Sequence, residues 1–163
     1  MFAADAPGDV FVRRMIIADL EKIAGGKFPA RRWGRGLVGQ GAQPIQAKGF
    51  AMGYSILEPH GGQVPWHNQE QEEVYFIVQG RGEICVGTER SEIKAGQCVY
   101  MPPKQFHQLT NTGDEPMHMI YVYCPGGDVA HWRQELAGTL PRAGEGDIPP
   151  LPAGAQPQCT KAP

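Results

Sequence analysis

The sequence predicts an all-β protein built as a double-sheet barrel. Between Gly49 and Cys124 the chain is a series of short apolar or alternating runs, separated by Gly, Pro, Asn or charged residues at the spacing typical of sandwiches and barrels. Glycine and proline are frequent, at 22 and 15 of 163 residues, and they punctuate the runs without forming a repeat. The runs are FAMGYSIL, VYFIV, GEICV, SEIK, QCVYM, FHQLT and MHMIYVY.

Two of these runs indicate that the strands form two packed sheets. Residues 74–78 are apolar at every position, as expected of a strand that is covered on both faces. Residues 82–86 alternate more openly, as a strand with one solvated face does. Together they favour a barrel made of two sheets.

The segments on either side of the strand-rich region have a different character. Residues 1–44 are interpreted as an N-terminal arm outside the core, with one short helix expected at 17–24 before Gly25 and Gly26. Residues 126–163 predict a helix at 128–136 with Asp128 as its N-cap, then a Pro-rich tail that is extended and either packed on a surface or mobile. We therefore expect a single domain, 1–163, with its barrel core at about 45–125.

Composition argues against several classes of partner. The formal net charge is -2 and no basic run or stripe is present, so we expect no nucleic-acid partner. No apolar run reaches the length of about 20 residues that spans a bilayer, and the N-terminus lacks the pattern of an export signal. The four cysteines form no C-x-x-C pair. We expect a soluble cytoplasmic protein with reduced thiols and no membrane partner.

Candidate metal ligands stand in two clusters inside the strand-rich region. The first cluster reads G-x5-H-x-Q-x3-E-x6-G and contains His67, Gln69 and Glu73. In an extended segment His67 and Gln69 leave the same face, and Glu73 can return to that face after a break near Gln71. The second cluster reads G-x5-P-x4-H-x3-N and contains His107.

These clusters predict a centre for one divalent metal. Two imidazoles and one carboxylate from neighbouring strands are the ligand set of the two-histidine, one-carboxylate triad, which leaves coordination positions open. The alternative is a barrel that has lost its metal and uses the three groups for internal hydrogen bonds. Metal binding is favoured because burying three ionisable ligands without a partner is costly.

The spacing of both clusters resembles the two motifs of the cupin superfamily. The family form is G-x5-H-x-H-x3-E-x6-G followed by G-x5-P-x-G-x2-H-x3-N, and eight of its ten defined positions agree between Gly61 and Asn111. The resemblance implies a jelly-roll barrel of the single-domain cupin type, commonly dimeric. It also implies metal ligands at the positions of His67, Gln69, Glu73 and His107.

This sequence departs from the family pattern at two positions. Gln69 stands where the family has its second histidine, and its neutral amide either ligates the metal weakly or hydrogen-bonds a group bound there. Lys104 stands where the family has a turn glycine, so either the turn differs or Lys104 adopts an uncommon backbone conformation.

Other polar side chains near the motifs have less specific expectations. Tyr75 continues on the face of Glu73, so it is expected either to line the pocket with its hydroxyl near the metal or to be an ordinary buried aromatic. Glu72 is expected on the opposite, solvated face. Tyr100 and Cys98 are assigned to core packing, with a place at the cavity wall as the alternative.

The remaining histidines and Asn111 are given structural roles. His60 and His131 are expected on a loop and a helix surface. His118 is interpreted as a structural histidine on a late strand, with an acid/base role in the pocket as the alternative. Asn111 is expected to form a turn-stabilising hydrogen bond at the end of its strand.

The leading functional hypothesis is a metal-dependent enzyme acting on a small organic substrate. The resemblance to cupin dioxygenases favours Fe(II) and oxygen-dependent cleavage, an oxidoreductase reaction in which Gln69 orients the bound substrate or oxygen. Zn(II), Mn(II) and Ni(II) are the other metals considered. The alternatives are a non-oxidative lyase, isomerase or decarboxylase in which Tyr75 moves a proton, and a sugar-binding or other small-molecule-binding cupin without chemistry. We expect a homodimer, with the arm and tail wrapping the neighbouring barrel.

Overall fold

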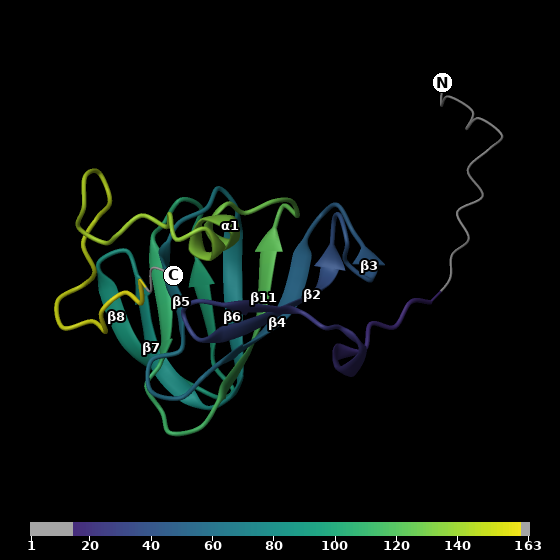
Figure 1. The fold of residues 1–163 in the computed structure, drawn as a ribbon, viewed down its shortest axis with the longest axis horizontal. Coiled ribbons are helices and arrows are strands. Elements are labelled where there is room, and N and C mark those ends of the chain that lie inside the picture. The colour runs from purple at the N-terminus through teal and green to yellow at the C-terminus, as the bar shows by residue number, and fades with distance from the viewer. Residues whose placement is uncertain (1–14, 161–163) are drawn as a thin grey trace.

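The computed structural model describes residues 15–160, which form a barrel of two β-sheets with one short α-helix (Figure 1). The larger sheet has the order β1-β2-β4-β11-β6-β9, with β3 paired to β2, and the smaller sheet has the order β5-β10-β7-β8. This arrangement confirms the predicted all-β jelly-roll. The elements are β1 (Gly26–Phe28), β2 (Arg32–Gly39), β3 (Ile45–Gln46), β4 (Ala51–Leu57), β5 (Gln63–His67), β6 (Glu72–Gln79), β7 (Arg81–Val86), β8 (Glu89–Lys94), β9 (Cys98–Met101), β10 (His107–Asn111), β11 (Met117–Cys124) and α1 (His131–Leu136).

The hydrophobic core lies between the two sheets. Strands β4 and β11 pair antiparallel, and in both strands buried residues alternate with partly exposed ones, because successive side chains point to opposite faces. Leu57, Ile77 and Met119 point inward from the larger sheet and meet Leu109 from the smaller sheet. The seven apolar runs quoted from the sequence correspond to strands β4 and β6 to β11.

The N-terminal segment contributes more to the sheet than the sequence indicated. Strand β2 pairs with β4 along most of its length, although these residues were assigned to an arm. The assignment missed β2 because glycines hold inward positions where apolar side chains would have signalled a strand. Gly36 is one of them, and an added Cβ there would meet the Gln43 side chain. Residues 1–14 of the expected arm lie outside the described residues.

The helix expected at 17–24 is wrong. Only a 3-10 turn, Leu20–Lys22, is present, and the Asp19 carboxylate accepts a hydrogen bond from the Glu21 backbone nitrogen at its start. None of the residues of this turn is buried, and a short helix without tertiary packing is marginal in water.

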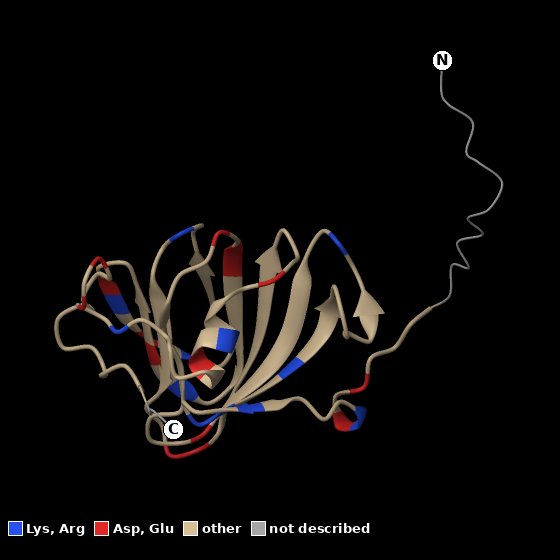
Figure 2. Ribbon diagram, turned by 45° about the horizontal axis from the view of Figure 1, so that its top comes forward, with Lys and Arg blue, Asp and Glu red and all other residues tan. Residues whose placement is uncertain are grey.

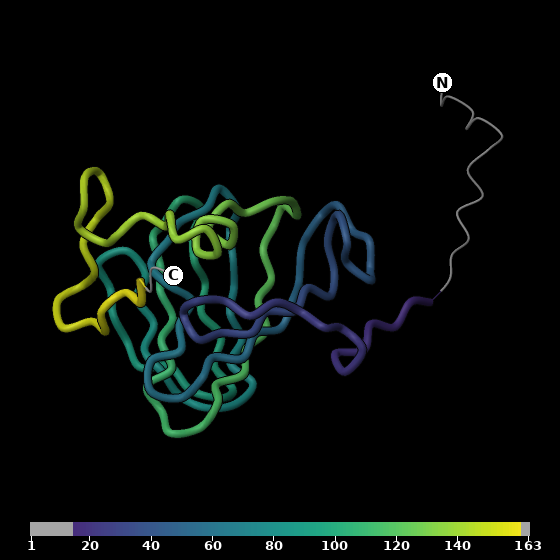
Figure 3. The backbone as a smooth tube through the Cα atoms, viewed as in Figure 1, coloured from purple at the N-terminus to yellow at the C-terminus, as the bar shows by residue number. Residues whose placement is uncertain are grey.

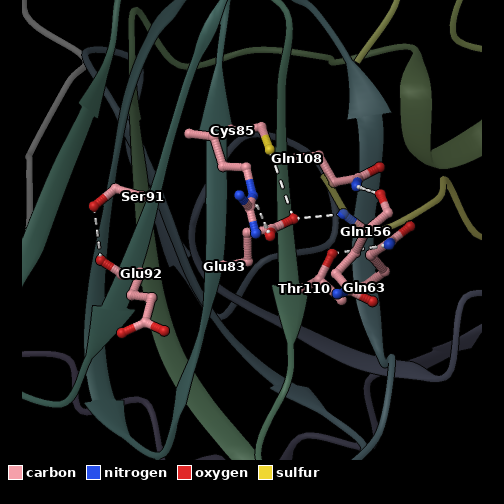
Figure 4. A network of polar contacts seen from close by, with 9 residues as sticks. Gln63, Glu83, Cys85, Ser91, Glu92, Gln108, Thr110 and Gln156 are labelled. Atoms are coloured by element: carbon pink, nitrogen blue, oxygen red, sulfur yellow. Dashed lines mark hydrogen bonds and ion pairs between the residues drawn. The ribbon is translucent and has the colours of Figure 1, made fainter. Parts of the chain in front are cut away.

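The C-terminal region contains helix α1 and a packed tail. Helix α1 has Ala130 as its N-cap without a side-chain bond, so the prediction of Asp128 as N-cap is wrong; the Asp128 carboxylate instead pairs with Arg133. The tail then follows the outer face of the smaller sheet (Figure 3). Gln156 lies at the centre of this contact, where its carbonyl accepts from Gln108 Nε2 at 2.9 Å and its nitrogen donates to Glu83 at 2.7 Å (Figure 4). The tail is therefore packed along a surface.

The outer face of the larger sheet is uncovered in the single chain. Phe76 and Val78 on β6 are each 42% exposed, so the prediction that residues 74–78 are covered on both faces is wrong for one chain alone. Tyr100 and Cys98 on neighbouring β9 are also exposed, which corrects their assignment to the core or the cavity. The Tyr100 hydroxyl donates to Glu72, which lies on the solvated face as predicted.

Charged residues of both signs are scattered over loops, strand edges and α1, and the ribbons of the sheets are largely uncharged (Figure 2). Within residues 15–160 no helix has the length and apolar character needed to cross a bilayer.

Candidate metal centre

His67 enters the barrel from the end of β5. Val64 and His67 both face inward although they are three residues apart, because the pairing with β10 shifts register between them. Pro65 lies within this irregularity, where a missing backbone donor is tolerated. The Pro65 carbonyl accepts a hydrogen bond from His67 Nδ1 at 2.7 Å. Since a carbonyl can only accept, the proton is on Nδ1 and Nε2 presents its lone pair to the interior.

His107 is held in the same way on β10. It is the cross-strand partner of His67, and the two ring centroids lie 4.2 Å apart. Its Nδ1 donates to the Gln105 carbonyl at 2.9 Å, which again directs Nε2 inward. Hydrogen bonds of this kind fix the tautomer and ring orientation of metal-binding histidines in proteins.

Glu73 reaches the same point from β6 in the opposite sheet. Its Oε2 lies 3.2 Å from His107 Nε2, and ligand atoms of His67, Glu73 and His107 all lie within 4.8 Å of one another. All three side chains are buried. The structure thus brings together the three ionisable ligands that the sequence proposed.

The electrostatics of this cluster favour a bound cation. Burial lowers the pKa of His67 well below its ordinary value, and the neighbouring His107 lowers it further. A neutral His67 leaves Nε2 as a buried acceptor, and this atom has no hydrogen-bond partner within residues 15–160. The contact between the Glu73 carboxylate and His107 Nε2 also requires positive charge between them. One divalent ion would satisfy all three groups, and the nitrogen and oxygen donors suit Fe(II), Zn(II), Mn(II) or Ni(II).

Gln69 lies in the connection between β5 and β6. Its backbone carbonyl accepts from Lys104 N at 2.7 Å, which joins the two motif loops. Both polar atoms of its side-chain amide are buried and have no partner among the described residues. Both atoms are therefore available to a bound group, the oxygen as an acceptor and the nitrogen as a donor.

Lys104 adopts a left-handed backbone conformation with φ of 65° at the motif position usually held by glycine. The turn geometry is thus kept without the glycine, as one of the two alternatives from the sequence proposed. The Lys104 ammonium points to Glu70 at 3.3 Å, and both side chains are exposed.

Tyr75 lies one inward position from Glu73 on β6 and is buried. Its ring packs edge-on against His107, with centroids 5.9 Å apart. Burial raises the pKa of the Tyr75 hydroxyl well above its ordinary value, and the Glu73 carboxylate raises it further. Tyr75 therefore keeps its proton at neutral pH and can act as a hydrogen-bond donor or an acid, but not as a resident base.

His131 was misplaced by the sequence reasoning. It was expected on a helix surface, but α1 lies over one end of the barrel (Figure 1) and buries His131 there. Its ring stacks on His67 with centroids 3.7 Å apart, and neither ring nitrogen has a partner among the described residues. Burial lowers its pKa well below the ordinary value, with His67 the next contribution.

A buried ion pair joins α1 to β2 beside His131. Arg32 donates to the Glu135 carboxylate, whose other oxygen accepts from the Ala30 nitrogen at 3.2 Å. The sequence reasoning missed Arg32 and Glu135. The spacing of His131 and Glu135, four residues apart in a short helix, was the signal that both face the barrel.

The other histidines and Asn111 lie away from the three ligands. His118 points to the outer face, where its Nδ1 is 2.8 Å from the Tyr54 hydroxyl, and His60 is on an exposed loop. Asn111 donates to the carbonyls of Leu57 and Glu115 and accepts from the Gly113 nitrogen, which confirms its role in a turn.

Two adjoining hollows lie on the α1 side of the candidate centre. A cavity of about 60 Å³ is lined by Glu73, Tyr75, Arg32 and His131 among others. A wider groove of about 340 Å³ adjoins it and shares Gly36, Tyr121 and Trp132 with its wall. Of the three candidate ligands, Glu73 lines the smaller cavity.

Residues 53–123, which contain both motifs and all three ligands, match the family model for the cupin domain. The chain belongs to the cupin superfamily. Glucose-6-phosphate isomerase of Pyrococcus horikoshii is 33% identical over 60 residues, a match that covers 34% of this cupin and 32% of the isomerase. The chain spans between about a third and just over half of the length of the curated relatives it matches, with shares from 31% to 56%.

Solved structures show the same fold. The DMSP lyase DddQ from Ruegeria pomeroyi superposes with a TM-score of 0.53 at 26% identity, over 71% of this cupin and 57% of the lyase. An oxalate oxidase in complex with the substrate analogue glycolate superposes with a TM-score of 0.57 at 18% identity, over 68% of this cupin and 60% of the oxidase.

Proposed function

We propose that this cupin is a metal-dependent enzyme acting on a small organic molecule, and that its reaction is an Fe(II)-dependent dioxygenation. The observation that supports this proposal is that ligand atoms of His67, Glu73 and His107 lie within 4.8 Å of one another, inside a barrel with an adjoining cavity. Three protein ligands leave positions for other groups. Bound iron would supply Lewis-acid and redox chemistry to a substrate and dioxygen.

The residues around the three ligands have separate tasks in this proposal. The carbonyls of Pro65 and Gln105 hold the two imidazoles in the ligating tautomer. Gln69 either ligates the ion or orients the substrate, since its amide is buried and unpaired within the described chain. Tyr75 donates a hydrogen bond from its protonated hydroxyl toward the site.

A second candidate, a non-oxidative lyase, isomerase or decarboxylase, is supported by Tyr75. Its buried hydroxyl beside Glu73 provides a proton donor, which a metal-dependent elimination or isomerisation requires. Among similar proteins are a DMSP lyase and several glucose-6-phosphate isomerases. Zn(II), Mn(II) or Ni(II) would serve this reaction.

The experiment that separates these candidates is reconstitution of metal-free protein with single metals. The Fe(II) form and the Zn(II) form are each incubated with a panel of small organic substrates, in air and anaerobically, while oxygen uptake and products are followed. Dioxygenation predicts oxygen uptake matched to substrate loss, with Fe(II) only. Anaerobic turnover with Zn(II), Mn(II) or Ni(II) would establish the second candidate instead.

Two variants make the result specific to the centre. His67→Ala should abolish turnover, whereas His60→Asn changes an exposed histidine and should leave it unchanged. Ligand binding that survives chelator treatment without any product would contradict both enzymatic proposals and indicate a binding protein.

A further inference from the structure

The small cavity beside the three ligands contains polar groups that metal binding does not use. Its volume of about 60 Å³ leaves room for a group of a few non-hydrogen atoms. Arg32, Tyr75 and His131 line it together with Glu73, and only Glu73 belongs to the candidate metal centre. The other three polar side chains surround this space from β2, β6 and α1.

Arg32 is the charged member of this group and is held in a fixed position. It is 2% exposed, its guanidinium carbon lies 4.1 Å from the centroid of the Phe28 ring, and Nη2 donates to Glu135. Its Nε is buried and has no hydrogen-bond partner among residues 15–160. A guanidinium presents five donors in a planar fork, so donors remain after the bond to Glu135.

A role limited to holding α1 against β2 accounts poorly for this arrangement. Buried ion pairs add little net stability compared with apolar residues of similar size, and a buried unpaired donor is unfavourable. His131 in the same wall likewise has two buried ring nitrogens without partners in the described chain. Polar atoms left unpaired around one small cavity indicate a ligand group that pairs with them.

A carboxylate is the group that fits these donors. Its two oxygens accept two parallel hydrogen bonds from a guanidinium, which an amide or alcohol does less well and a cation cannot do. Glu135 already balances the charge of Arg32. A divalent ion held by two neutral imidazoles and Glu73 keeps one positive charge in excess, which a monocarboxylate would cancel.

We propose that Arg32 binds the carboxylate of the substrate, so that the substrate is a small organic acid; this inference rests on the proposed function. The acid group occupies the cavity beside Glu73, and the remainder of the molecule extends past Tyr121 and Trp132 toward the wider groove.

The test measures binding of propionate and of uncharged propionamide to the full chain loaded with Zn(II), by isothermal titration calorimetry. Arg32→Met combined with Glu135→Met removes both charges, so no unpaired buried charge remains. Arg32→Lys keeps the positive charge opposite Glu135 but removes the paired donors of the guanidinium. This variant replaces the double variant in the test if the double variant fails to fold. Arg35→Met, on the outer face of the same strand, is the matched control.

The expected result is that propionate binds more tightly than propionamide to the wild type. Propionate affinity falls about tenfold or more in the double variant and falls also in Arg32→Lys, while Arg35→Met is unchanged. Zinc content stays the same in all four proteins. Equal propionate affinity in folded Arg32 variants, or no preference for propionate in the wild type, would overturn the assignment. A wild type that does not bind zinc would instead contradict the metal centre. Failure of the carboxylate site and failure of the proposed function are therefore distinguishable.

Discussion

Lowering the pH from 7 to 5 should destabilise the metal-free protein through its two stacked buried histidines. The pKa of His67 and the pKa of His131 are both lowered, chiefly by burial, so both imidazoles stay neutral in the folded chain. In the unfolded chain they take up protons below a pKa of about 6.5. The unfolded state therefore binds more protons as the pH falls, and the free energy of unfolding decreases.

The magnitude follows from this difference in proton uptake. Each histidine that stays neutral contributes a slope of up to about 1.4 kcal/mol per pH unit below its unfolded pKa. From pH 7 to pH 5 this amounts to at most roughly 2 kcal/mol for each, or at most roughly 4 kcal/mol for the pair, reached when both imidazoles stay neutral down to pH 5. This stability is fully present above pH 6.5 and is lost as the pH falls toward the folded pKa values. Partial burial also lowers the pKa of His118, which adds to the loss in the same direction.

Urea unfolding of chelator-treated protein at pH steps between 7 and 5 measures this loss, with tryptophan fluorescence as the signal. His131→Phe keeps an aromatic ring against His67 and removes one titrating group, so it should reduce the slope by nearly half. His60→Asn changes an exposed histidine and should leave the slope unchanged. The reasoning is refuted if the urea concentration at the unfolding midpoint does not decrease as the pH is lowered from 7 to 5. It is also refuted if His131→Phe leaves the pH slope of the unfolding free energy unchanged.

Three further predictions concern the metal, the barrel wall and the oligomer. Zn(II) at about 100 times its dissociation constant should stabilise the folded chain by about 2.7 kcal/mol and raise the melting temperature by roughly 5–11 °C in calorimetry, an effect absent in His107→Ala. Gly53→Ala places a Cβ 2.2 Å from the Tyr121 hydroxyl, so the free energy of unfolding measured in urea should fall by about 1–3 kcal/mol. In the control Gly41→Ala the added Cβ meets no neighbouring atom and only the positive φ is unfavourable, so the free energy of unfolding should fall less. We propose that the uncovered face of β6 pairs two chains: sedimentation should show a dimer that Phe76→Glu converts to a monomer, and a monomeric wild type would contradict this.

The alternating runs allowed the sequence to predict the strands, and the two motifs identified the three candidate ligands that the fold brings together. Alternating runs mark strands such as β4 because one face packs on the core, and His67, Glu73 and His107 were identified from spacing alone. The motif turn at Lys104 retained its left-handed geometry without glycine. These features depend on local periodicity and turn conformation, which a single sequence records.

The cavity wall could not be predicted in the same way. Arg32 lies on a strand whose inward glycines hide the alternation, and its burial depends on Glu135, 103 residues later in the chain. His131 is buried only because α1 lies over the barrel end, which its sequence of six residues does not specify. Contacts between distant segments decide these positions, so propensity and spacing carry little information about them.

The central claim is that His67, Glu73 and His107 bind one divalent ion. Elemental analysis of protein purified without added metal tests it most directly, with His67→Ala, His107→Ala and the exposed-site control His60→Asn analysed in parallel. The account predicts one divalent ion per chain in the wild type and in His60→Asn, and a large loss in both alanine variants. Equal metal content in all four proteins, or a wild type that retains no divalent ion and takes up none on incubation with Fe(II) or Zn(II), would contradict it.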